Sequence, residues 1–201
     1  MSKEKTAAVQ PKAKVELDPR FTAKLTLTLL GICAVVALLL GVVNSVTEPI
    51  IEEIQAEKTA AAMSLVLPAD EYQKVKTTYP NVTAMNKAMS GGEQIGYVVE
   101  VATNGFGGAM SMVVGVDMNG AVTGVSVTDN SETANIGTKV VNDQTVLDRF
   151  IGMSHADGEI TVNSGTNRFD GVSGATVSSK GVTAGVNTAL AAVAEQKGGE
   201  A

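Results

Sequence analysis

The chain has 201 residues, of which 44% are hydrophobic and 18% are charged, so it can form a domain with a core and is not disordered as a whole. Only 3% of the residues are aromatic whereas 21 are glycine, which favours a core of small side chains over aromatic stacking platforms. The net charge of −6 argues against nucleic acid as the main partner.

The first predicted element is an apolar helix over residues 25–46, with the sequence "LTLTLLGICAVVALLLGVVNSV". These 22 residues carry no charge, and a helix of this length spans roughly 33 Å, enough for a bilayer core of about 30 Å. The run therefore predicts a transmembrane helix in a lipid bilayer. A buried core helix and a cleaved signal peptide are the alternatives, although a signal peptide has a shorter apolar region and a small-x-small exit.

Charge predicts the orientation of this helix. Residues 1–24 hold six basic and three acidic side chains, and the rest of the chain sums to −9. Since basic residues collect on the cytoplasmic side, we expect 1–24 to be a cytoplasmic N-terminal tail and everything after Val46 to lie outside the cytoplasm. The expected location is thus the inner (cytoplasmic) membrane, crossed once.

The remaining chain is predicted to form three parts. The segment "EPIIEEIQAEKTAAAMSLVLP" continues as a helix, with Ile50, Ile51, Ile54 and Ala61 at helical spacing and Pro68 as its end. We expect a helical stalk at 47–68, a domain at 69–196 and a C-terminal tail at 197–201.

Within that domain, the pattern predicts an antiparallel meander followed by helices. Residues 95–103, 109–117 and 121–129 are rich in β-formers and are joined by short glycine-containing turns. The "GFGG" at 105–108 lacks a Walker lysine and joins two strands, so it is interpreted as a tight turn, not a phosphate loop. In 69–94 only three residues suggest packing, namely Tyr72, Val75 and Tyr79.

A short amphipathic helix is predicted at 144–153 and a short strand around Ile160 and Val162. The helix turns four side chains inward: Val146, Leu147, Phe150 and Ile151. A final helix begins near Ser178, with an apolar stripe of Val182, Val186, Ala189, Leu190 and Val193. The fold class is therefore α+β, with an antiparallel sheet and a C-terminal helix.

The sequence "DGVSGATVSSKGV" at 170–182 crowds small residues around the Thr176 hydroxyl just before that final helix. A nucleophilic threonine needs a base, yet the chain has one histidine, His155, without a carboxylate pattern around it. The one cysteine, Cys33, lies in the apolar helix, so the outer domain has no thiolate chemistry or disulfide of its own. Two uses stay open: phosphate binding at a helix N-terminus, or plain helix capping by a hydroxyl.

The letters "DGVSGAT" resemble the flavinylation motif of the FMN-binding domain family, Asp-x-x-Ser/Thr-Gly-Ala-Thr. In that family a flavin transferase joins the FMN phosphate to the last threonine through a phosphoester, which makes the protein a phosphoprotein. Here that threonine is Thr176, and Asp170, Ser173, Gly174 and Ala175 match the other positions.

The layout as a whole is similar to the G subunits of Rnf complexes and, more distantly, to the C subunits of the sodium-pumping NADH:quinone oxidoreductase. Members often have His-Ser-Glu-Thr-Pro-Gly-Leu-Gly where this chain has "NSETANIG". Glu132, Thr133 and Gly137 match that pattern and are implied to face the flavin ring or ribityl chain, whereas 134–136 depart from it. Besides Thr176, the resemblance implies that the phosphate is surrounded by Ser173, Gly174, Ala175, Val177, Ser179 and Lys180.

The resemblance implies an electron-transfer subunit of a translocase that couples ferredoxin:NAD⁺ oxidoreduction to Na⁺ or H⁺ movement. The cofactor would be FMN, covalent at Thr176, with no metal and no complete active site in this chain. Its partners would be the other membrane and iron–sulfur subunits of an Rnf-type complex, and a flavin transferase for maturation. Two alternatives stay open: a stand-alone membrane-anchored flavoprotein of extracellular electron transfer, and a non-redox tethered binding module.

Overall fold

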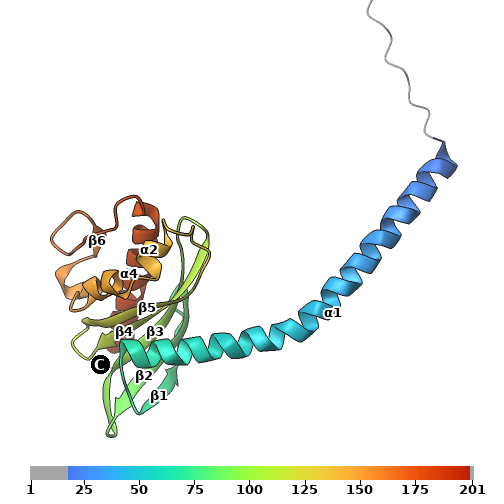
Figure 1. Ribbon diagram of the computed structural model, residues 1–201. Helices are drawn as coiled ribbons and strands as arrows, with labels where there is room; N and C mark the ends of the chain where they lie inside the picture. The colour runs from blue at the N-terminus through green and yellow to red at the C-terminus, as the bar shows by residue number, and fades with distance from the viewer. Residues whose placement is uncertain (1–17, 200–201) are drawn as a thin grey trace, which may run out of the picture. The chain divides into compact units, whose positions relative to one another are not determined.

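The computed structural model describes residues 18–199 (Figure 1). The sequence-predicted N-terminal tail therefore falls largely outside the described residues, and the C-terminal tail does so in part. The chain divides into two compact units, Met1–Ile51 and Glu52–Ala201.

Helix α1, Pro19–Val66, runs for 48 residues without interruption. Among the described residues it is the one helix long and apolar enough to cross a membrane, with a mean hydropathy of 2.7 in its most apolar window. Pro49 lies inside it, and a proline has no N–H to donate to the carbonyl four residues earlier. The side chains of the predicted span, including Cys33, are exposed, as lipid-facing residues would be.

The second unit contains a five-stranded sheet in which each strand pairs with the next one along the chain. All four pairings are antiparallel, which confirms the predicted meander. Its strands are β1 Glu71–Val75, β2 Val82–Ser90, β3 Glu93–Asn104, β4 Ala109–Asp117 and β5 Val122–Asn130.

Strands β1 and β2 fall within residues 69–94, for which the sequence predicted no element. Their composition is polar, and β2 has the sequence "VTAMNKAMS", without the β-branched run that marks β3 to β5. They form because β2 pairs with the apolar β3 along most of its length and β1 adds outside it. Tyr72, Val75 and Tyr79 do pack against the core, as expected.

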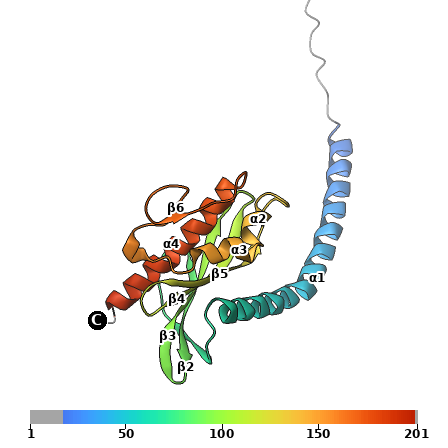
Figure 2. The same ribbon diagram turned by 60° about the vertical axis from the view of Figure 1, so that its left-hand side comes forward.

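Helix α4, Thr176–Gly199, packs mainly on β3 and covers one face of the sheet (Figure 2). The predicted apolar stripe of this helix is buried in the larger core cluster, together with alternate residues of the strands such as Val99, Val101, Met112 and Val114. The glycines Gly181 and Gly185 face the sheet, where an added Cβ would meet Asn104 and Met112.

The opposite face of the sheet is covered by the last turns of α1. Ala62, Val66 and Leu67 form a second cluster with Ala88, Val98 and Val113. Ile50, Ile51, Ile54 and Ala61 lie within α1, as their helical spacing predicted, but their side chains are exposed, and the buried residues of the helix lie nearer its C-terminal end.

Two glycines let the end of α1 approach the strands. A Cβ at Gly115 or Gly124 would collide with the backbone of Val66. The Thr123 hydroxyl donates to the Val66 carbonyl at 2.7 Å, which satisfies one of the carbonyls that a helix C-terminus leaves unpaired. The end of α1 is thus capped by the sheet itself.

Short elements connect β5 to α4: α2 Thr138–Val141, α3 Gln144–Leu147, η1 Asp148–Phe150, η2 His155–Asp157, β6 Thr161–Val162 and β7 Arg168–Phe169. Phe150 and Phe169 stack with ring centroids 4.0 Å apart. Of the four residues expected to point inward, Val146, Leu147 and Phe150 are buried, but Ile151 was predicted wrongly and is 52% exposed. The reason is that the helix gives way to the η1 turn, after which Ile151 is no longer helical.

Candidate functional site

The site is built around the beginning of α4. Thr176 is the first residue of this helix and its side chain is exposed. A turn precedes it, in which the Ala175 N–H donates to the Val172 carbonyl at 3.0 Å. Gly174 has φ +81°, and no atom lies within 4 Å of an added Cβ, so the glycine is required by the backbone conformation alone.

The helix start leaves donors free for an anion. The Ser179 N–H makes the first helical hydrogen bond, to Ala175 O at 2.9 Å. Helix geometry therefore leaves the N–H groups of residues 176–178 without a partner inside the helix, at the positive end of its dipole. A phosphate esterified to Thr176 would lie within reach of these groups.

Ser179 and Lys180, both predicted phosphate neighbours, have opposite environments. Lys180 is exposed. Ser179 is fully buried, and its Oγ accepts a hydrogen bond from the Val172 N–H at 3.2 Å. Ser179 thus ties the turn before Thr176 to the helix, which fixes the path of the "SGAT" stretch.

The first motif residue, Asp170, is exposed and held by two arginines. Its carboxylate pairs with Arg168 at 2.9 Å, and its carbonyl accepts from Arg149 Nη1 at 2.9 Å. The next N–H, of Gly171, donates to Asn163 Oδ1 at 2.9 Å. The segment before Thr176 is therefore fixed while the Asp170 side chain stays accessible.

Glu132 joins three segments at this end of the fold. One carboxylate oxygen accepts from the Phe106 N–H at 2.8 Å, and the other accepts from the Ser178 hydroxyl at 2.9 Å. Phe106 lies in the β3–β4 turn, Glu132 follows β5, and Ser178 is in the first turn of α4. The carboxylate therefore links this turn to the helix that begins at Thr176.

Glycines make room for that carboxylate. A Cβ at Gly105 or Gly137 would coincide with an oxygen of Glu132. Gly107 is equally restricted, because its Cβ would meet the carbonyl of Ser131. A side chain at Gly105 or Gly137 would thus displace the Glu132 link.

The Thr133 side chain is exposed, and its carbonyl accepts from the N–H groups of Ile136 at 3.2 Å and Thr138 at 3.4 Å. Asn135 has φ +62°, a conformation that asparagine tolerates better than most residues. The loop whose letters depart from the family pattern is thus a hydrogen-bonded turn leading into α2.

Taken together, the structure brings Glu132 and Gly137 next to Ser178, two residues from Thr176. Sequence reasoning missed Ser178 and Phe106. Ser178 carries no signal beyond being a serine in a small-residue stretch, whereas an aromatic between glycines in a chain with few aromatics was a signal for Phe106.

The chemistry of the site suits FMN in two respects. Free N–H groups and an exposed hydroxyl suit its phosphate, and exposed apolar side chains at Phe106, Ile136 and Val177 suit its ring. Among the described residues no group of three or more His, Cys, Asp or Glu could hold a metal ion. His155, the one histidine, is exposed in η2.

Comparison with known proteins shows the family of the chain. Residues 105–191 match the FMN-binding domain family. The G subunit of the Na⁺-translocating ferredoxin:NAD⁺ oxidoreductase complex of Acetobacterium woodii is 31% identical, over 90% of this chain and 96% of that protein. The G subunit of an ion-translocating oxidoreductase complex of Methanosarcina acetivorans is 30% identical, over 90% and 99%. A crystal structure of the C subunit of a Na⁺-translocating NADH-quinone reductase from Parabacteroides distasonis superposes with a TM-score of 0.48 and 20% identity, covering 56% of this chain and 61% of that one.

The fold and site thus define an α+β protein in which an FMN-binding domain follows an apolar N-terminal helix along the chain. The chain belongs to the family of G subunits of ion-translocating oxidoreductase complexes, the Rnf family. With its one described span candidate and its membrane-complex relatives, it is a single-pass membrane protein.

Proposed function

We propose that this protein carries FMN esterified to Thr176 and relays electrons within a complex that couples ferredoxin:NAD⁺ oxidoreduction to Na⁺ or H⁺ translocation. The observation that carries the proposal is the exposed Thr176 hydroxyl at the start of α4, inside the "DGVSGAT" stretch. FMN supplies the electron-accepting and electron-donating chemistry, and the protein supplies placement and electrostatics.

Each residue around Thr176 has a distinct part in holding the phosphate. Ser173, Gly174 and Ala175 lack bulk, so the phosphate can approach the backbone there. The N–H groups of the first turn stabilise its negative charge, and the exposed Lys180 adds a positive charge nearby. Ser179 contributes by fixing the turn, since its hydroxyl is already bonded to Val172.

Attachment requires an activated flavin phosphate. The donor is a diphosphate that joins the flavin to a nucleoside. The Thr176 oxygen attacks the flavin-side phosphorus, so one P–O anhydride bond breaks, one phosphoester bond forms, and the nucleoside monophosphate leaves. The hydroxyl proton passes to a base of the flavin transferase. The exposed Asp170 and the small neighbours of Thr176 leave room for that enzyme.

The experiment is co-expression of the full chain with its flavin transferase, followed by denaturing electrophoresis and peptide mass spectrometry. We expect a band that fluoresces under ultraviolet light and an FMN adduct on the Thr176 peptide. Thr176→Ala should lose both, whereas Thr166→Ala, at an exposed loop threonine, should keep both. A bare Thr176 in protein from its native membrane would contradict the proposal and favour the tethered binding module.

A stand-alone flavoprotein of extracellular electron transfer is the second candidate. Purification in mild detergent distinguishes the two, because only a member of a complex brings other membrane and iron–sulfur subunits with it. We propose the complex, since the chain matches G subunits along nearly all of its length.

We also propose how the chain is arranged at the membrane. Residues 1–24 are cytoplasmic, 25–46 span the inner (cytoplasmic) membrane, 47–68 form the stalk, 69–196 form the extracytoplasmic domain and 197–201 the tail. The positive-inside rule supports this orientation.

The span offers surfaces for neighbouring subunits. Its small residues include Gly31, Ala34, Ala37 and Gly41, and a Cβ added at either glycine would meet no atom beyond the helix's own backbone within 4 Å. Small residues allow close approach of helices in a bilayer.

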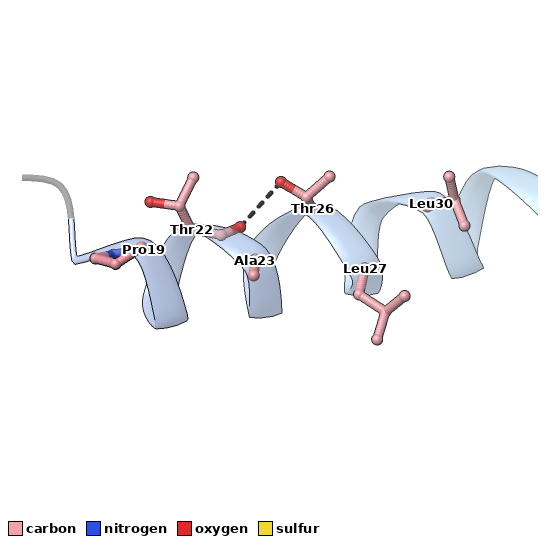
Figure 3. Close-up of a pocket in the computed structure, with 6 residues that line it drawn as sticks. All are labelled: Pro19, Thr22, Ala23, Thr26, Leu27 and Leu30. Carbon is pink, nitrogen blue, oxygen red and sulfur yellow. Dashed lines mark hydrogen bonds between the residues drawn. The ribbon is translucent and has the colours of Figure 1, made fainter.

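Figure 3 shows the first turns of α1, where the Thr26 hydroxyl donates to the Thr22 carbonyl at 2.9 Å and so hides one polar group from lipid. The open, largely apolar groove there is lined by Pro19, Thr22, Ala23, Thr26, Leu27 and Leu30.

A further inference from the structure

Three large apolar side chains stay exposed on the segments that meet near Thr176: Phe106 at 69%, Val177 at 51% and Ile136 at 49%. The domain has few aromatic residues, and the others are placed differently. Tyr97, Phe150 and Phe169 are buried, and Tyr72 and Tyr79 are partly buried. From residue 52 onward, Phe106 is thus the one aromatic side chain in the described part of the chain that is exposed.

This exposure does not come from a loose loop. The Gly105 N–H donates to Gly108 O at 2.9 Å, which closes the turn. The Phe106 N–H donates to Glu132, and the two flanking glycines have no room for a side chain. A rigid backbone therefore presents an aromatic ring to solvent, where it gains nothing from burial.

The same contacts place Phe106 beside the attachment point. Its N–H and the Ser178 hydroxyl bind the two oxygens of one carboxylate, and Ser178 is two residues from Thr176. One turn after Val177 on the same side of α4, Gly181 packs against Asn104 and Gly105. The β3–β4 turn thus lies along the side of the helix that carries Val177.

We propose that Phe106 is the aromatic contact of the isoalloxazine ring, with Val177 and Ile136 completing an apolar platform, and that Glu132 positions this platform. The inference rests on the proposed attachment of FMN at Thr176. A tether inside an apolar patch argues for the tethered ring as its occupant, because offset stacking of aromatic rings is favourable beyond the area it buries. Each oxygen of Glu132 accepts one hydrogen bond, from the Phe106 N–H or from the Ser178 hydroxyl, so Glu132 can position the platform through these two residues.

The test replaces Phe106 by an electron-rich ring that quenches an excited flavin on contact. The full chain is flavinylated, purified in detergent and checked for one flavin per protein by mass. Phe106→Trp should shorten the flavin fluorescence lifetime and reduce its emission several-fold. The matched control is Met118→Trp, at a residue that is 42% exposed in the β4–β5 turn, at the other end of β4 from Phe106. It should leave emission and lifetime unchanged.

Glu132 is tested in the Phe106→Trp background. Glu132→Ala removes both acceptor oxygens, so the links to the Phe106 N–H and to the Ser178 hydroxyl are both lost. We expect the covalent flavin to remain and the quenching to weaken, with an unchanged far-ultraviolet circular dichroism spectrum showing that the fold persists. Undiminished quenching would overturn the positioning role of Glu132.

The failure of this inference differs from failure of the proposed function. A Thr176 without flavin contradicts the proposed function. A flavinylated Phe106→Trp protein with wild-type emission defeats only the ring contact. If, in that case, the emission of Trp at position 106 shifts when the other members of the complex are present, the platform is an interface with a neighbouring protein, which also overturns the proposal.

Discussion

At the scale of single residues, the turn before α4 depends on one backbone conformation. Gly174 has φ +81° in open space, and an L-residue held in that region costs roughly 1–2 kcal/mol. We predict that Gly174→Ala lowers the stability of the full chain in detergent by about that amount, measured by urea unfolding. Because the turn also shapes the surroundings of Thr176, flavinylation should slow. An unchanged unfolding midpoint would show that the turn adapts without strain.

Glu100 lies on the face of β3 that also carries Val98 and is covered by the end of α1, and it lowers the stability of the fold in a pH-dependent way. Burial raises the pKa of Glu100, and the positive charge of Lys74 offsets this only in part. Since the pKa is higher in the folded state, this loss of stability is absent below the ordinary pKa of 4.5, grows as the pH rises from there to the folded pKa, and is constant above it. Glu100→Gln should therefore melt higher than the natural chain at pH 7, and the difference should shrink in acid. A lower melting temperature at pH 7 would mean that attraction to Lys74 outweighs burial.

At the residue level, a local sequence pattern predicted where the last helix begins, but not which distant side chains meet there. The stretch before Thr176 was predicted from its letters, and the structure has it as an exposed helix start. The bonds from Glu132 to Phe106 and Ser178 bridge 26 and 46 residues of sequence. No local pattern encodes such contacts, so these partners could not be found without the fold.

At the scale of elements, glycines on the side of α4 that faces the sheet let the helix pack closely against the strands. An added Cβ at Gly181 would meet the Asn104 backbone, whereas Gly198, near the end of the same helix, has no neighbour. We predict that Gly181→Ala destabilises the chain by about 1–3 kcal/mol through overpacking. Gly198→Ala should be neutral or gain at most about 1 kcal/mol, as alanine favours the helix. Thermal unfolding of the two variants in the same detergent separates the effect of packing from that of helix propensity. Equal shifts in melting temperature would contradict the prediction.

The elements that were predicted and those that were missed differ in how they gain stability. β3, β4 and β5 are β-rich and lie close to their predicted bounds. β1 and β2 are polar, and their conformation is set by pairing with β3. Tertiary context decides the structure of such segments more than local propensity does.

At the scale of the whole molecule, charge is divided by the apolar span. Six basic residues precede residue 25, while the remainder sums to −9. For the proposed orientation we predict that Met118→Cys, in a Cys33→Ser background, reacts with a membrane-impermeant thiol reagent in intact cells or spheroplasts. A cysteine placed at Ser2 should react only after the membrane is opened. The reverse labelling pattern would show that the chain has the opposite orientation in the membrane.

The capped end of α1 has a consequence for the order in which the nascent chain acquires its fold. Val66 is shielded by Gly115, Gly124 and Thr123, and the Thr123 partner emerges 57 residues later. Until β5 has been synthesised, the Val66 carbonyl lacks the Thr123 hydroxyl as its partner, although β2, β3 and β4 already supply the apolar contacts to this end of the helix. The segment that bears Thr176 comes later still, so Phe106 and Ile136 leave the ribosome before the acceptor hydroxyl, and the platform is completed only when Val177 follows it.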